Sequence, residues 1–350
     1  MKTLAENLRD PKLLPFTRQS LEFYCDFLSK VSPHYYQFSG IEFSLFSDDD
    51  FCDWLVELKP QTLSWNCSQE LPGINLGCET YKRLSTYFND KKFKCSKEVR
   101  NIWFEYDWFT SYNKHINKLT PSIFFGSRAD NSYGAYKLLN HVFPALPEIS
   151  WILDIAKSSN LQLTQAGYMS GRKVPSLRVV FTSYRFPDIE RFISTIGLPT
   201  LHNSKFKIFL LDSNPSLLAI GLDIADSGIV SNAYGIEIYQ EWMNSSTWLN
   251  LLNSLTKAYG TCSKVNALSK LFLTDRFFPK VYKQPFKNIQ DTHQILVCNS
   301  FTGPHHLKAS FHPNHDFPKF KAYVGFLFPH LLNTKGMVSL SETYEFENND

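Results

Sequence analysis

Carboxylates at alternating positions in four strand-like segments are the residues of this sequence best suited to chemistry. Each acid lies between two apolar residues. Because side chains alternate across a strand, the apolar neighbours share one face and the acid lies on the other. If helices cover the apolar face, the acids line the opposite surface of the sheet. The acids are Glu42, Glu105, Asp223 and Glu237, with Asp107 on the face of Glu105 and Tyr239 on that of Glu237.

Basic side chains alternate in the same way in four other segments. In one curved sheet, the acids and cations would surround a single polar lumen. An ordinary half-exposed antiparallel sheet, with water on its polar face, would produce the same alternation. The residues on these faces are Arg178; Lys205 and Lys207; His306, Lys308 and Ser310; and Lys319, Lys321 and Tyr323.

Strand-like and helix-like segments follow one another along the whole chain. Turn residues at 170–173 and 212–215 indicate hairpin connections, which join antiparallel strands. We therefore predict an α+β fold with a largely antiparallel sheet or barrel clad by helices. Helical spacing of apolar residues predicts helices at 21–30, 49–58, 79–88, 149–157, 189–196 and 247–255. Strands are predicted at 38–46, 101–107, 122–125, 161–169, 176–182, 206–211, 217–224, 234–239, 294–298, 306–312 and 320–328.

One short internal similarity bears on domain organisation. Residues 40–43 precede a predicted helix that carries Trp54, and residues 235–238 precede one that carries Trp248. Duplicated strand–helix units would make the barrel pseudo-symmetric, and chance is the alternative explanation for so short a match. We predict one large domain over residues 1–350, or two related halves that meet near 198–215.

A helix-clad antiparallel barrel with a polar, aromatic lumen resembles the αββα-barrel aromatic and peptide prenyltransferases. In that family, strands with a basic-x-Lys-x-Tyr pattern hold a prenyl diphosphate. Lys319-x-Lys321-x-Tyr323 is similar to this pattern, with Lys in the first place, where the indole enzymes usually carry Arg. Lys308 would be a second phosphate contact, but Ala309-Ser310 follows it where Lys-x-Tyr is expected. The close match covers about one strand.

The resemblance implies roles for the alternating residues. Ionising an allylic diphosphate develops negative charge on pyrophosphate, which fixed cations stabilise, and positive charge on the allyl group, which ring faces stabilise while they exclude water. Glu105 would hold the N–H or O–H of the acceptor, with Glu42 or Glu237 as substitutes. The implied substrate-binding residues are Arg178, Lys207, Lys308, Lys321, Tyr323, Glu237 and Tyr239.

Composition narrows the class of protein further. Of the 350 residues 43% are hydrophobic and 15% aromatic, which is globular composition and fits either a Phe-rich core or a cavity walled by rings. The net charge of +3 is too small to indicate nucleic acid. Residues 257–335 hold eleven Lys or Arg against three acids, which suits an anion site or a solvated basic face.

The cysteines and the N-terminus predict a cytoplasmic protein. Seven scattered cysteines without a C-x-x-C pair indicate neither a disulfide framework nor a zinc site. The first ten residues lack the apolar core of a signal peptide, and no segment has the length of a membrane-spanning helix. No P-loop or G-x-G-x-x-G occurs, so nucleotide cofactors gain no support.

Three functions remain open from the sequence. The first is a transferase that attaches a prenyl group from a prenyl diphosphate to an aromatic or peptide acceptor. The second is an enzyme in which Glu42, Glu105, Asp107, Asp223 and Glu237 gather divalent metal. No motif requires a cofactor, and Mg²⁺ is the one these acids suggest. The third is a non-catalytic protein whose basic C-terminal third binds RNA or an acidic partner.

One further acidic motif is assigned a structural role. Asp49-Asp50-Phe51-Cys52-Asp53 matches the D-D-x-x-D of the all-helical isoprenoid synthases. Here it would open the helix predicted at 49–58, where acids cap the first turn and interact favourably with the helix dipole. We therefore predict that these acids cap a helix and do not bind magnesium.

Overall fold

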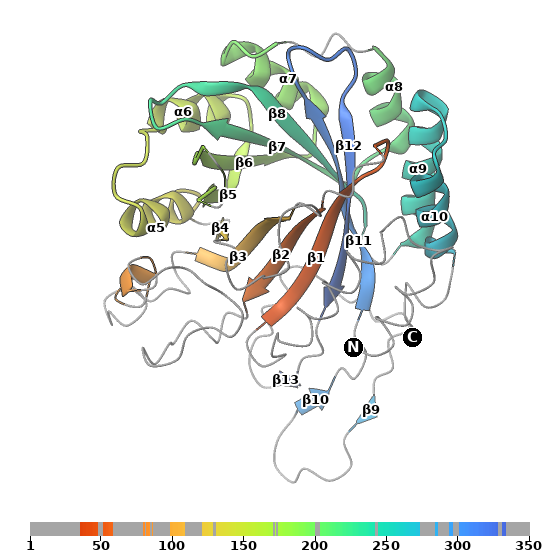
Figure 1. Cartoon of the computed structure of the whole chain (residues 1–350), viewed down its shortest axis with the longest axis horizontal. Coiled ribbons are helices and arrows are strands. Elements are labelled where there is room, and N and C mark those ends of the chain that lie inside the picture. Colours follow the sequence, from red (N-terminus) through yellow and green to blue (C-terminus); the bar gives the residue numbers. More distant parts are fainter. Residues whose placement is uncertain are drawn as a thin grey trace.

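Ten antiparallel strands close into a barrel at the centre of the molecule (Figure 1). The order around the barrel is β1-β12-β11-β8-β7-β6-β5-β4-β3-β2. The strands are β1 Tyr36–Ser44, β2 Cys52–Leu58, β3 Val99–Trp108, β4 Ser122–Ser127, β5 Gln162–Tyr168, β6 Leu177–Ser183, β7 Leu217–Ile224, β8 Val230–Tyr239, β11 Phe301–Phe311 and β12 Lys319–Leu327. The computed structural model describes residues 36–47, 52–58, 80, 82–84, 86, 99–108, 121–128, 131–170, 172, 174–199, 204–241, 244–273, 284–285, 294–296, 301–327 and 331–333.

Helices lie on the outside of the barrel and cover its apolar face (Figure 1). Three short strands, β9 Gln284–Pro285, β10 Gln294–Leu296 and β13 Leu331–Asn333, form a separate small sheet. This architecture confirms the predicted α+β antiparallel barrel clad by helices. The helices are α5 Gly134–Val142, α6 Ser150–Ser158, α7 Phe186–Thr195, α8 Ser204–Ser213, α9 Ser245–Tyr259 and α10 Ser263–Phe272.

The alternation of side chains along each strand separates the core from the lumen. On β1, Ile41 and Phe43 point outward and are buried under the helices, whereas Glu42 lies between them and points into the lumen. On α8, Phe206 and Phe209 pack against Phe320 of β12, with ring centroids 6.4 and 5.7 Å from it. The hydrophobic core is therefore the layer between helices and barrel, and the polar residues remain inside.

The secondary structure of two segments was predicted wrongly, with helix and strand interchanged. The predicted helix at 49–58 contains the strand β2, and the predicted strand at 206–211 lies inside the helix α8. The hairpin expected at 212–215 joins α8 to β7 instead of two strands, whereas the hairpin at 170–173 does join β5 to β6, which pair antiparallel. The helix expected to carry Trp54 in the internal similarity is also wrong, because Trp54 lies on a strand, whereas Trp248 lies on a helix as expected.

The remaining predictions fall into three groups. The other predicted strands, and the helices at 149–157, 189–196 and 247–255, overlap observed elements, whereas α5 and α10 were not predicted. The described residues of the helix predicted at 79–88 are also helical. The predicted helix at 21–30 lies outside the described residues, and the division near 198–215 stays a prediction. Among the helices that the structure describes, none is both long and apolar enough to cross a lipid bilayer.

Candidate functional site

The register of the strands brings four polar side chains together at one level of the lumen. Glu42 of β1 faces Tyr323 of β12 on one side and Asp53 of β2 on the other, and Asp53 faces Asp107 of β3. Asp53, which the sequence suggested would cap a helix, thus points into the lumen because β2 is a strand. Glu42 and Asp53 are each 1% exposed.

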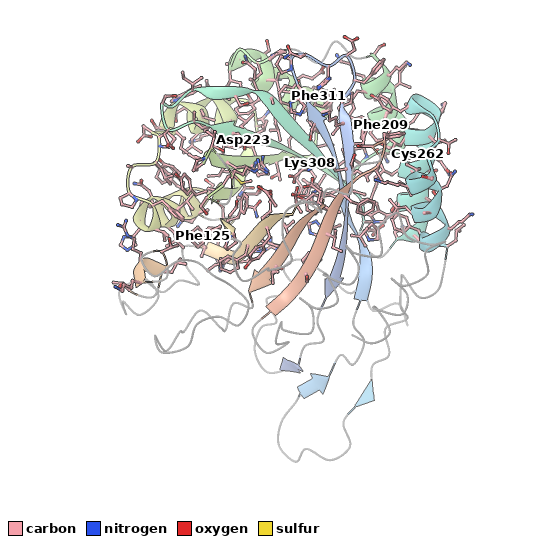
Figure 2. The ribbon with its side chains drawn as sticks, in the orientation of Figure 1. Phe125, Phe209, Asp223, Cys262, Lys308 and Phe311 are labelled. Atoms are coloured by element: carbon pink, nitrogen blue, oxygen red, sulfur yellow. The ribbon has the colours of Figure 1, made fainter. Side chains whose placement is uncertain are left out.

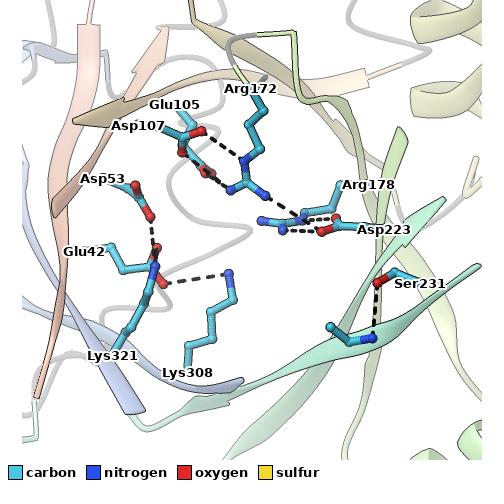
Figure 3. Close-up of polar contacts among 11 residues, drawn as sticks. Glu42, Asp53, Glu105, Asp107, Arg172, Arg178, Asp223, Ser231, Lys308 and Lys321 are labelled. Atoms are coloured by element: carbon cyan, nitrogen blue, oxygen red, sulfur yellow. Dashed lines mark hydrogen bonds and ion pairs between the residues drawn. The ribbon is translucent and has the colours of Figure 1, made fainter. Parts of the chain in front are cut away.

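Lys321 joins the first two of these acids (Figure 3). Its Nζ donates to Asp53 Oδ2 at 3.0 Å and to Glu42 Oε2 at 3.3 Å, and Lys308 Nζ lies 3.7 Å from Glu42 Oε1. Burial alone would raise the pKa of Glu42, but Lys308 and Lys321 outweigh it and hold this pKa well below its ordinary value. Burial dominates at Asp53, whose pKa is well above its ordinary value. The pair therefore favours one carboxylate and one carboxylic acid.

Two arginines bind the acids of the opposite wall (Figure 3). Arg178 Nε and Nη2 donate to the two oxygens of Asp223 at 2.7 and 2.9 Å. Arg172 extends from the β5–β6 turn, and its Nε donates to Asp107 Oδ2 at 2.9 Å, while Nη2 contacts Glu105 Oε1 at 3.5 Å. Arg172 was missed from sequence because it lies on a turn, where strand alternation gives no signal.

Glu105 is the most deeply buried acid of this wall, with 5% of its surface exposed. Burial raises the pKa of its carboxyl and Asp107 adds to this, so that together they outweigh the opposing effect of Arg178, Arg172 and Lys308. A carboxyl with a raised pKa keeps its proton to higher pH and is a stronger base once ionised. This adds a capacity for proton transfer to the role predicted for Glu105, which is to hold the N–H or O–H of the acceptor.

Aromatic rings close the lumen below the charged layer. Phe38 lies 5.3 Å from both Trp103 and His305, and Tyr239 lies 5.7 Å from His305, all as distances between ring centroids. Burial lowers the pKa of His305 to about 3, so this imidazole is neutral and behaves as one more ring. The rings form an uncharged floor.

Two predicted substrate-binding residues, Tyr239 and Tyr323, lie in this floor or next to it. Tyr239 donates its hydroxyl to Glu237 Oε2 at 2.6 Å. Tyr323 stacks on His306 with ring centroids 3.9 Å apart. Burial, followed by the charge of Glu42, raises the pKa of Tyr323 well above its ordinary value, so this residue keeps its proton.

A cavity of about 760 Å³ opens from the lumen at the end of the barrel that carries the β11–β12 turn. Arg172, Arg178, Lys308 and Lys321 line its inner part. Figure 2 shows Lys308 and Asp223 inside the ring of strands. Two aromatic side chains at its mouth are exposed to solvent, Phe46 by 40% and Phe317 by 55%. The cavity thus combines a charged interior with an apolar rim.

One predicted site residue does not join this cluster. Lys207 lies on α8 outside the barrel, where its Nζ is 2.5 Å from Glu190 Oε1 on α7. Its neighbour Lys205 places Nζ 5.5 Å from the centre of the Phe317 ring. Helical structure explains the error, since alternation along a strand no longer determines where these lysines point. The other predicted site residues lie on barrel strands and face the lumen: Glu105, Arg178, Glu237, Tyr239, Lys308, Lys321 and Tyr323.

The acids predicted to gather metal divide into separate groups. Within the described residues, Asp53, Glu105 and Asp107 form a set in which one oxygen of each lies within 4.8 Å of the others. Asp223 is paired with Arg178, and Glu237 accepts from Tyr239. The set that could hold a divalent cation is therefore smaller than the predicted one and includes Asp53.

Glu57, near the aromatic end of β2, provides a pH-dependent prediction. Burial raises the pKa of its carboxyl from 4.5 to about 7, although the hydrogen bond from Asn101 opposes this. The folded protein then binds more protons than the unfolded chain between these values, so its stability falls as pH rises from about 4.5 to about 7. We expect a loss of about 3 kcal/mol at full ionisation, and Glu57→Gln should remove it.

The measurement is the free energy of unfolding of wild type and Glu57→Gln at about pH 5 and about pH 8. The buried histidines titrate in both proteins, so the difference between the two isolates Glu57. An equal change of stability with pH in both proteins would show that Glu57 has an ordinary pKa.

No protein-family model matches the chain, and a search of curated proteins finds no match to it. Among solved structures the chain is similar to a 6-dimethylallyl tryptophan synthase, with 10% sequence identity over 82% of this chain and 80% of that one. The TM-score of 0.45 is low, so the fold assignment rests on the strand pairing of this chain alone.

Proposed function

We propose that this protein transfers a prenyl group from a prenyl diphosphate to an aromatic or peptide acceptor. The observation that carries the proposal is the convergence of four cations on one cavity, because one of them, Arg172, also contacts the buried carboxyl of Glu105. Arg178, Lys308 and Lys321 border the cavity, and Arg172 links it to Glu105. Leaving-group cations and a proton acceptor are what ionisation and transfer require within one enclosed space.

The diphosphate would bind to the inward cations. Lys308 approaches Glu42 only to 3.7 Å, beyond hydrogen-bond length, so a phosphate oxygen would compete with a weak contact. Lys321 and Arg178 have closer carboxylate partners and would share their remaining donors. Fixed ammonium and guanidinium groups would then stabilise the pyrophosphate that leaves with the electron pair of the broken C–O bond.

The acceptor would lie between the allyl group and Glu105. As the allyl carbon forms its new bond, the acceptor loses a proton, which the Glu105 carboxylate would accept. Tyr323 and the rings of the floor would present π faces to the developing cation, with a stabilisation on the order of 0.5–2 kcal/mol each. Phe46 and Phe317 would contact the part of the acceptor that stays outside.

The set Asp53, Glu105 and Asp107 supports a second candidate, a divalent-metal enzyme. Carboxylate oxygens at this separation suit Mg²⁺. Arg172 and Lys321 already contact these acids, however, and a cation would have to displace at least one of them. The third function, RNA binding, loses support because Lys308 and Lys321 point into the lumen instead of forming an outer surface.

Calorimetry with dimethylallyl diphosphate, geranyl diphosphate and inorganic pyrophosphate tests the proposal, with and without Mg²⁺. We expect both allylic diphosphates to bind more tightly than pyrophosphate, because the rings add apolar contacts. Mass spectrometry of aromatic peptides incubated with the better donor then detects transfer. Folded protein that binds neither allylic diphosphate at millimolar concentration would exclude the proposal.

A further inference from the structure

Carboxylates outnumber fixed cations among the described lumen residues. One surplus carboxylate lies on the wall of Glu105, Asp107 and Asp223, which we call the carboxylate clamp, because these three acids share two guanidiniums, those of Arg172 and Arg178. Three negative charges against two positive ones leave one charge unbalanced when all are ionised. An unbalanced buried carboxylate is costly unless a proton or a cationic ligand compensates it.

One buried polar atom beside the clamp points independently to a ligand. Ser122 faces Glu105 across the β3–β4 pair and is 1% exposed. Its Oγ has no hydrogen-bond partner among the described residues. Since buried hydroxyls without a partner are uncommon, a polar group bound in this part of the lumen would satisfy it.

The guanidinium of Arg172, a residue of the β5–β6 turn, lies in the carboxylate clamp. Arg172 bridges β3 and β7, which are not neighbours in the barrel, through contacts of 2.9 Å to Asp107, 3.5 Å to Glu105 and 3.8 Å to Asp223 (Figure 3). Its side chain is 29% exposed at the cavity. The spacing of the three acids therefore already fits a planar group with several N–H donors.

The turn that carries Arg172 is held independently of this side chain. Ser170 Oγ donates to Pro121 O at 2.7 Å, and Met169 N donates to Ser176 O at 2.9 Å. Neither of these contacts involves the guanidinium, so both would stay in place if the side chain rotated toward the open mouth. Leaving the clamp would break the ion pairs with Asp107, Glu105 and Asp223, which another guanidinium could form instead.

We propose that the carboxylate clamp is a guanidinium-binding site, and that Arg172 fills it until an arginine side chain of the acceptor takes its place. Exchanging the guanidinium of Arg172 for that of another arginine keeps the positive charge and the arrangement of N–H donors in the clamp. A neutral phenol would bring one donor and no charge, and a divalent cation would lie close to Lys321, which already binds Asp53 at 3.0 Å. The identification of the ligand as the acceptor rests on the proposed function, whereas the binding site does not.

The test measures the binding of N-acetyl-arginine methylamide without any diphosphate, so its outcome is independent of prenyl transfer. Removing the competing side chain with Arg172→Ala should tighten binding by roughly tenfold or more, since a site that is rarely open binds with reduced apparent affinity. The citrulline analogue, which has nearly the same shape without the charge, should bind at least about tenfold more weakly than the arginine probe.

Arg185→Ala is the matched control, because Arg185, the residue before α7, has a side chain that is 69% exposed and pairs with Asp188 at 3.8 Å. It should leave the affinity for the probe at the wild-type value. Adding Asp107→Asn to Arg172→Ala should weaken binding by about tenfold, since it removes the carboxylate with the shortest contact. If Arg172→Ala does not fold, Arg172→Gln, which keeps a shorter, uncharged polar side chain, is measured in its place.

Two outcomes would overturn the inference. One is folded Arg172→Ala or Arg172→Gln protein that binds neither probe at millimolar concentration, or that binds citrulline as tightly as arginine. The other is stabilisation of the variant against heat by Mg²⁺ and not by the arginine probe, which would make the clamp part of a metal site.

Discussion

Lys321→Ala should lower both the stability of the barrel and the rate at which the bound prenyl diphosphate ionises. We expect this combined effect to be larger than that of any other single substitution. The ammonium of Lys321 is the link between Glu42 and Asp53, which are both buried. Removing one partner of a buried ion pair costs about 3–5 kcal/mol, because the remaining charge is left uncompensated. The same ammonium would stabilise the departing pyrophosphate, and losing such a contact slows a reaction by roughly a hundredfold or more.

The stability defect should depend on pH in a defined direction. Without Lys321, the raised pKa of Asp53 in the folded state should rise further and the lowered pKa of Glu42 should rise, so the folded variant takes up protons that the folded wild type does not. Stability relative to wild type is then lost as pH rises through those values. Denaturant titrations should show a larger difference from wild type at about pH 8 than at about pH 5.

Lys137→Ala is the control for Lys321→Ala. Lys137 is exposed on α5, outside the barrel, and does not line the cavity. Its loss should change stability by no more than about 0.5 kcal/mol, as for most surface substitutions. Similar effects of the two substitutions on stability and on diphosphate affinity would contradict the bridging role assigned to Lys321.

Alternation along strands was sufficient to predict much of the site. Glu42, Glu105 and Lys308 could be placed in the lumen because a strand puts every second residue on one face, and the helices take the other face. The register between strands was not predictable in this way. That Glu42 lies between Tyr323 and Asp53 depends on pairing with residues distant in sequence, for which a single sequence carries no local signal.

The two segments whose secondary structure was predicted wrongly contain both a helix-like and a strand-like pattern. Residues 204–213 begin with alternating charged and apolar residues, like a strand, yet Phe206, Phe209 and Leu210 are buried at helical spacing and form the apolar face of α8. Acids before β2 resemble a helix start, yet Asp53 and Glu57 alternate with Val56 as in a strand. In both segments, packing against the barrel decided between two patterns that the sequence permits.

Glu105→Gln should reduce kcat for prenyl transfer by roughly a hundredfold or more, while the affinity for the allylic diphosphate stays near the wild-type value. Glutamine keeps the shape of the side chain and one oxygen for Arg172, but it cannot accept the proton that the acceptor releases. In wild type the rate should rise with pH as Glu105 loses its proton, with the midpoint above the ordinary value for glutamate because burial raises this pKa. The variant should lose this rise.

The matched control for Glu105→Gln is Glu57→Gln, which alters another buried carboxyl with a raised pKa. Glu57 accepts a hydrogen bond from Asn101 at 2.6 Å, lies on β2 and does not line the cavity. An amide oxygen can still accept from Asn101, so transfer should keep most of its rate. Single-turnover rates and calorimetric affinities for dimethylallyl diphosphate separate the two steps. Wild-type kcat in Glu105→Gln, or an equal loss in Glu57→Gln, would remove Glu105 from its role as proton acceptor, because neither result is compatible with a single carboxylate that takes the proton of the acceptor.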